Sequence, residues 1–313
     1  MTFVAKLAYL ALFPGMLFLA FAGVASRSLA GSVPGIVLGG SARGPSLTVP
    51  DLARTMRGET VAAGGSLHAV MWLAPVLKLA ALSWASCVLF GMVRGDLTLL
   101  FSLLVLAGIA DLLLFAASTN PRVRRNAPAE AWALLGWALP LGIVLAALYL
   151  RTGAWTVQAL VDWQVANGTL LGSAQGGGAL VATGGALSFA AVCVCMVTLA
   201  RFRPFGRGLL SDPPSGAISD VSGAPLALVR LGEGATLFLS ALLPVALFLA
   251  GSASTWYGLV FWALKVAGLV LLAGVLDLLF ARSASRRAAF RALGAGGVLS
   301  LAGLVLIWVG VRI

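Results

Sequence analysis

Seven ionisable side chains fall within or at the edge of long apolar stretches of this sequence. An ionised group near the centre of a bilayer costs about 2.5–3.5 kcal/mol on an insertion scale, so it must pair, be neutral or face other protein groups. Carboxylates and amines at several depths could pass protons along, because desolvation favours their uncharged forms. They could also bind an ion or polar substrate, or form static pairs that fix helix packing, and the residues leave these three readings open. The seven are Lys78, Asp111, Glu130, Arg230, Glu233, Lys265 and Asp277.

The spacing of one pair of these residues has a direct structural meaning. Arg230 and Glu233 are three residues apart, so on a helix they share one face and could pair with each other. Asp111 lies well inside its apolar stretch, whereas Asp277 lies near the end of its own. The charges therefore occupy several depths, as a relay needs.

Residues that hold redox groups are scarce in this sequence. His68 is the one histidine, so a haem with two axial histidines cannot form within the chain. The three cysteines, Cys87, Cys193 and Cys195, have no CxxC spacing and are too few for an iron–sulfur cluster or a NiFe site. We therefore expect no cofactor and no metal in this chain, and no catalytic residue.

The elements that carry these residues are long apolar helices. The chain is 60% hydrophobic and 10% charged, whereas a soluble domain has about 25% charged residues. A membrane-spanning helix needs about 20 predominantly apolar residues. These features predict an all-α polytopic membrane protein, a single transmembrane domain over residues 1–313 without sequence repeats. The eight expected spans cover residues 7–27, 69–93, 97–118, 130–150, 178–200, 225–250, 258–280 and 293–311.

The distribution of basic residues predicts the orientation of the chain in the membrane. Fourteen arginines fall in the loops that follow the first, third, fifth and seventh spans, and four basic residues fall on the opposite side. Loops rich in Lys and Arg stay in the cytoplasm, so both termini are expected on the outer side. The same rule accounts for the net charge of +11, so nucleic acid is not expected as a partner. The opposite-side residues are Lys6, Arg94, Arg151 and Arg312.

The segment of residues 41–59, between the first two spans, has a helical pattern of its own. Thr48 and Asp51 are spaced like a capping box, and a proline at position 50 is tolerated in a first helical turn. Val49, Leu52 and Met56 then share one face. This pattern fits an amphipathic helix at the cytoplasmic membrane surface, although an ordinary basic loop remains open from the residues alone.

The same segment resembles a known family. "RGPSLTVPDLARTMRGE" (43–59) is similar to the amphipathic segment of the membrane-heel subunit of respiratory complex I and of energy-converting NiFe hydrogenases and formate hydrogenlyases. Three further stretches resemble the family in the same order: "RFRPF" (201–205), "DVSGAPLALVRLGEGATLFLSALL" (220–243) and "FWALKVAGLVLLAGVLDLLFARSASRRAAFR" (261–291). The Arg-Gly-Pro opening is closer to the hydrogenase-type branch.

The resemblance implies a non-catalytic membrane subunit of a multi-subunit oxidoreductase in the bacterial inner membrane. Such a subunit anchors hydrophilic iron–sulfur and hydrogenase-like subunits on the cytoplasmic face and couples electron transfer to proton or sodium translocation through antiporter-like neighbours. Iron–sulfur clusters, with or without a NiFe centre, are then expected in the partner subunits. The loop of residues 206–220 is short and offers only Asp212 and Asp220 as acids, so a quinone is not expected.

Within this reading, particular residues receive roles. Asp111, Glu233 and Asp277 are expected to carry charge, Glu130 matches an acid that opens the family's fourth span, and Lys78, Arg230 and Lys265 are expected to tune these acids. Two alternatives stay open, a stand-alone secondary transporter and a structural anchor without an ion path. The residues expected to dock the redox arm are Arg43, Asp51, Arg54, Arg57, Asp212 and Asp220.

Overall fold

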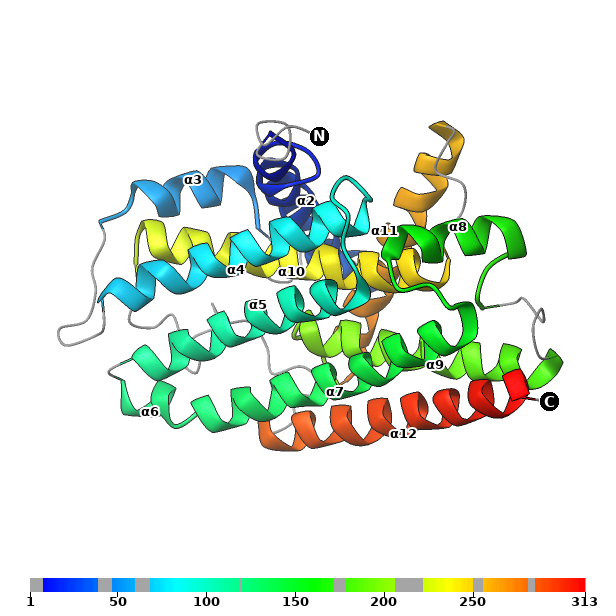
Figure 1. The fold of residues 1–313 in the computed structure, drawn as a ribbon. Helices are drawn as coiled ribbons and strands as arrows, with labels where there is room; N and C mark the ends of the chain where they lie inside the picture. Colours follow the sequence, from blue (N-terminus) through cyan, green and yellow to red (C-terminus); the bar gives the residue numbers. More distant parts are fainter. Residues whose placement is uncertain are drawn as a thin grey trace.

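The computed structural model of this chain is a bundle of long helices (Figure 1). It describes residues 8–38, 47–59, 68–118, 120–171, 178–205, 222–249, 256–280 and 285–312. Eight helical segments of this part are long and apolar enough to cross a membrane, which confirms the predicted fold class. The helices are α2 (Met16–Leu38), α3 (Val49–Arg57), α4 (His68–Leu89), α5 (Leu97–Ala117), α6 (Pro121–Arg124), α7 (Ala127–Thr152), α8 (Val157–Asn167), α9 (Gly178–Leu199), α10 (Ala224–Phe248), α11 (Trp256–Leu279) and α12 (Ser285–Arg312).

The first membrane helix is bent and runs further than the sequence predicted. Residues 8–11 are helical, residues 12–15 form a bend that contains Pro14, and α2 then continues to Leu38. The predicted first span covered residues 7–27 and ended at Arg27. The helix continues because residues beyond Arg27, such as Ala30 and Val33, are apolar and buried. Arg27 therefore lies inside a helix, and its side chain is buried.

Helix α10 forms the centre of the molecule (Figure 1). It is buried along its whole spanning length and contacts α2, α4, α9 and α11. Small residues allow the closest of these approaches, as is common in membrane helices. A Cβ atom added at Gly23 of α2 would lie 2.6 Å from the backbone nitrogen of Ala235, and one at Gly234 would lie 2.8 Å from the carbonyl oxygen of Gly23. Backbones of α2 and α10 thus touch directly.

Helix α3 is the predicted amphipathic segment, and its capping pattern is confirmed. Thr48 is the N-cap, its hydroxyl oxygen accepts from the Asp51 amide at 3.3 Å, and it also donates to the Asp51 carboxylate. Leu52 packs against the core, whereas Val49 and Met56 are exposed. The helix packs on α10.

The two ends of the bundle are distinguished by their short helices. At one end, called here the α6 end, α5 and α9 finish and α7 and α10 begin. At the other, called the α8 end, α10 finishes against α8 (Figure 1). There the buried Gln164 of α8 donates to the carbonyl oxygen of Leu247 at 3.1 Å. This bond satisfies a carbonyl that a helix C-terminus leaves without an intrahelical partner.

Candidate functional site: a buried ion-pair cluster

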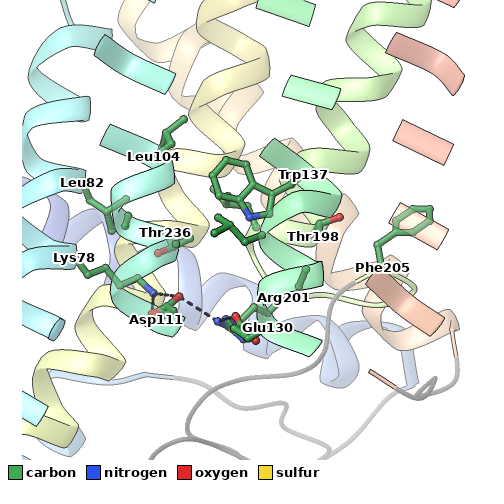
Figure 2. Close-up of a pocket in the computed structure, with 15 residues that line it drawn as sticks. Lys78, Leu82, Leu104, Asp111, Glu130, Trp137, Thr198, Arg201, Phe205 and Thr236 are labelled. Atoms are coloured by element: carbon green, nitrogen blue, oxygen red, sulfur yellow. Dashed lines mark hydrogen bonds and ion pairs between the residues drawn. The ribbon is translucent and has the colours of Figure 1, made fainter. Parts of the chain in front are cut away.

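Four charged side chains from four parts of the chain meet inside the bundle near the α6 end (Figure 2). The Lys78 ammonium donates to both carboxylate oxygens of Asp111, at 2.9 and 2.8 Å. A guanidinium nitrogen of Arg201 lies 3.1 Å from the same carboxylate. Arg201 also binds Glu130 through both of its terminal nitrogens. We call these four residues the ion-pair cluster.

The cluster is secluded from solvent and lies within the membrane-spanning part of the bundle. None of its four side chains is more than 10% exposed. Asp111 precedes the last residue of α5, Ala117, by six positions, which corresponds to roughly 9 Å along the helix axis. Buried ion pairs gain little net stability, because desolvation offsets their attraction, but removing one partner leaves a buried charge uncompensated. The four charges therefore depend on one another.

The end of α9 delivers Arg201 to this cluster. The amide of Phe202 donates to the carbonyl oxygen of Val197, and the amide of Arg201 donates to the carbonyl oxygen of Thr198. These are the two hydrogen bonds of a Schellman motif. Arg201 occupies the left-handed position of this motif, with φ of 65°. Glycine is favoured there, and another residue is strained by about 1–3 kcal/mol. The strain is offset by the contacts that the guanidinium makes with Asp111 and Glu130.

A small cavity adjoins the ion-pair cluster. Its volume is about 40 Å³, and all four cluster residues line it together with Thr198, Thr236 and Trp137 (Figure 2). One water needs about 10–15 Å³ of such space and two to four polar partners. The cavity therefore has room for about three waters beside carboxylates and hydroxyls. Such waters could carry protons between the charged groups.

A third carboxylate, that of Glu233 on α10, interacts electrostatically with the ion-pair cluster. Its side chain is 5% exposed, and its charge acts on that of Arg201. The neighbouring Gly232 faces the other cation, because a Cβ added there would lie 3.3 Å from the Lys78 side chain. With Glu233 included, the site contains three carboxylates and two cations.

The remaining predicted path residues lie elsewhere. Lys265 donates to the carbonyl oxygen of Leu249 at 2.8 Å, which caps α10 at the α8 end. The sequence allowed a pair between Arg230 and Glu233; in the structure Arg230 donates to the hydroxyl of Thr55 on α3 at 3.1 Å. Arg230 therefore joins α3 to α10.

Asp277 belongs to a second charged site. Its carboxylate accepts from the backbone amide of Arg203 at 2.9 Å and lies 3.6 Å from the Arg203 guanidinium. Arg201 and Arg203 were counted only as loop charges in the sequence. The signal that could have identified them is the family-like "RFRPF" stretch.

The structure describes three of the six predicted docking residues, Asp51, Arg54 and Arg57. Arg54 and Arg57 of α3 are exposed, and Arg54 lies 3.8 Å from Asp51 in a surface pair. Such an exposed pair adds little stability, so these charges are accessible to a partner. Arg43, Asp212 and Asp220 lie outside the described residues.

Comparisons with known proteins cover almost the whole chain. A family model described as NADH dehydrogenase matches residues 6–310. No curated protein matches the sequence. Among solved structures, the chain is similar to one chain of the membrane-bound sulfane sulfur reductase, an archaeal respiratory membrane complex. The TM-score is 0.75 at 18% sequence identity, over 93% of this chain and 97% of that chain. The helical bundle described above is therefore the shared fold.

Proposed function

We propose that this chain, which belongs to the NADH dehydrogenase family and is a membrane subunit of a complex I-like assembly, couples electron transfer in partner subunits to proton movement at its ion-pair cluster. It spans the membrane several times and works in a respiratory membrane complex with other subunits. The predicted family is confirmed. The roles of individual residues, the ion and the partners belong to the proposal.

One observation carries the proposal: charged groups from α4, α5, α7 and the end of α9 form a connected site beside a cavity with room for water. Asp111 and Glu130 share the Arg201 guanidinium, and the charge of Glu233 acts on the same group. Moving Arg201 or Lys78 would therefore change which acid is compensated, and the uncompensated acid would take up a proton. A partner that shifts the end of α9 could drive this exchange. Sodium remains the alternative ion, because carboxylates bind either.

The hydrophilic partners are proposed to dock at the α6 end. Exposed arginines there lie on α3, α6 and the start of α12. The distribution of basic residues favours the cytoplasm for this end and the outer side for both termini, in a bacterial inner membrane. Iron–sulfur and hydrogenase-like subunits would bind this face and hold all redox groups, without a quinone in this chain. Antiporter-like subunits would lie beside it in the membrane.

The test is Glu233→Gln in the intact complex reconstituted into proteoliposomes. This change keeps the size of the side chain and removes the exchangeable proton. We expect electron transfer and subunit composition to stay normal while the proton gradient, measured with a pH-sensitive dye, disappears. Asp162→Asn, at an exposed acid near the α8 end, is the matched control and should pump normally.

Two other outcomes would change the proposal. Normal pumping by Glu233→Gln and by a parallel Glu130→Gln variant would favour a structural anchor, which the complete pairing of the cluster also fits. Isolation of the tagged chain from native membranes, folded but without any oxidoreductase subunit, would contradict the partner proposal. Substrate uptake by that isolated chain would then identify a transporter.

A further inference from the structure

A second charged cavity lies between α2 and α11, outside the ion-pair cluster. Its volume is about 200 Å³. Arg27 of α2, Asp277 of α11, and Phe202 and Arg203 from the segment after α9 line it, with small residues such as Gly31 and Gly274. It is several times larger than the cavity beside the cluster. The space exceeds that of one water more than tenfold, so a larger polar group fits.

The described walls of this cavity carry an excess of positive charge. Arg27 is 4% exposed, and its guanidinium lies 5.5 Å from the centre of the Phe202 ring. Arg203 supplies a second guanidinium. The acid of the lining, Asp277, already accepts from the backbone amide of Arg203, and its carboxylate lies 3.6 Å from the Arg203 guanidinium. The described lining therefore contains two arginines and one carboxylate.

The chemistry of the two arginines selects the ligand class. A guanidinium binds phosphate oxygens through two parallel hydrogen bonds, and it is more weakly hydrated than an ammonium, which favours such contacts at partly buried sites. Basic pockets between membrane helices on the cytoplasmic side are known to take lipid headgroups. We propose that the α2–α11 cavity binds the phosphate group of an anionic ligand.

The position of the cavity favours a phospholipid as the source of that phosphate. Asp277 and Leu278 belong to the last turn of α11, where a span reaches the headgroup layer. Together with α12, helices α2 and α11 have the least buried membrane spans of the described part of the chain. Exposed apolar side chains flank the cavity on both helices, including Ile36 of α2 and Leu279 of α11. Acyl chains could lie along these side chains while the phosphate occupies the cavity.

The experiment uses the full-length chain, purified with its assembly and exchanged into nanodiscs of phosphatidylcholine with a small fraction of phosphatidylglycerol. Native mass spectrometry then counts the phosphatidylglycerol retained after detergent release. We expect preferential retention by the wild type and a loss of about fivefold or more in Arg27→Gln. Arg203→Gln, whose backbone bond to Asp277 survives, serves as a second variant where loss of the buried Arg27 impairs folding. Arg124→Gln, at an exposed arginine of α6, is the control.

A second arm separates lipid from soluble phosphate. Inorganic phosphate is titrated against the lipid-depleted protein, and its binding is followed by calorimetry. Binding of inorganic phosphate that depends on Arg27 and Arg203, without lipid preference, would support the anion site with a soluble ligand. Equal lipid retention in the wild type and both variants, together with no phosphate binding that depends on these arginines, would overturn the proposal.

Discussion

Arg201 and Arg203 are separated by one residue, yet their guanidinium groups pair with carboxylates in two different sites of the bundle. Arg201 binds Asp111 and Glu130 in the ion-pair cluster, whereas Arg203 binds Asp277 beside the α2–α11 cavity. The Schellman motif at the end of α9 turns the chain between them. A displacement of this short segment would therefore act on both sites at once, which makes it the natural place for a partner to influence the buried charges.

Replacing Arg201 should destabilise the bundle strongly. In Arg201→Leu, Glu130 loses the guanidinium that donates to it through two nitrogens, and Asp111 keeps the Lys78 ammonium. Breaking a buried pair costs about 3–5 kcal/mol, so the thermal midpoint in detergent should fall clearly below that of the wild type. Arg124→Leu, at an exposed site on α6, should change it little. Equal midpoints for the two variants would mean that water already screens the cluster.

The contact between α2 and α10 should tolerate no extra methyl group. Gly23→Ala would place a Cβ 2.6 Å from the backbone nitrogen of Ala235. Backbone atoms cannot move aside cheaply, so we expect a loss of about 1–3 kcal/mol in unfolding free energy. Gly297→Ala is the matched control, since no atom lies within 4 Å of its added Cβ, and alanine favours a helix by up to about 1 kcal/mol. A denaturant titration measures both, and a stable Gly23→Ala variant would contradict the direct backbone contact.

Removing the N-cap of α3 should loosen that helix alone. Thr48→Ala deletes the hydroxyl that accepts from the Asp51 amide. Loss of an N-cap costs about 1 kcal/mol, equivalent to about fivefold faster exchange of amide hydrogens in α3. Hydrogen exchange followed by mass spectrometry measures this rate. Ser32→Ala, which removes an exposed hydroxyl bonded within α2, should leave exchange in α3 unchanged. Unchanged exchange in Thr48→Ala would show that contacts with α10 alone hold α3.

Charge removal on α3 should release the hydrophilic partner while the bundle stays folded. Arg54 and Arg57 are exposed, so the double Gln variant keeps all buried contacts. We expect less partner protein to co-purify, and the wild-type complex to dissociate more readily as salt screens these charges. Arg94→Gln, an exposed arginine outside α3 that is expected on the opposite side of the membrane, is the control. Full recovery of the partner by the double variant at all salt concentrations would exclude α3 from the docking face.

Local properties of this protein follow from its sequence. Long apolar stretches specify the eight spans, because a helix must satisfy its own backbone in lipid. The capping pair of Thr48 and Asp51 specifies the start of α3 through neighbouring atoms. The order of family-like stretches predicted the family, and the match over residues 6–310 confirms it. In each case the information lies within a few consecutive residues or in their order.

The pairing of the charges was decided by the tertiary structure. The sequence put Arg230 and Glu233 on one helix face as a possible pair, because helical spacing tells which residues share a face. It does not tell which neighbouring helix that face meets. Partners in the cluster are 33, 71 and 90 residues apart, and Arg201 entered it from a segment that looked like a basic loop. Lys265 lies within an apolar stretch, as Lys78 does, but its ammonium caps the far end of α10. Packing of whole helices fixes such contacts, since a buried charge takes whichever partner that packing brings within reach.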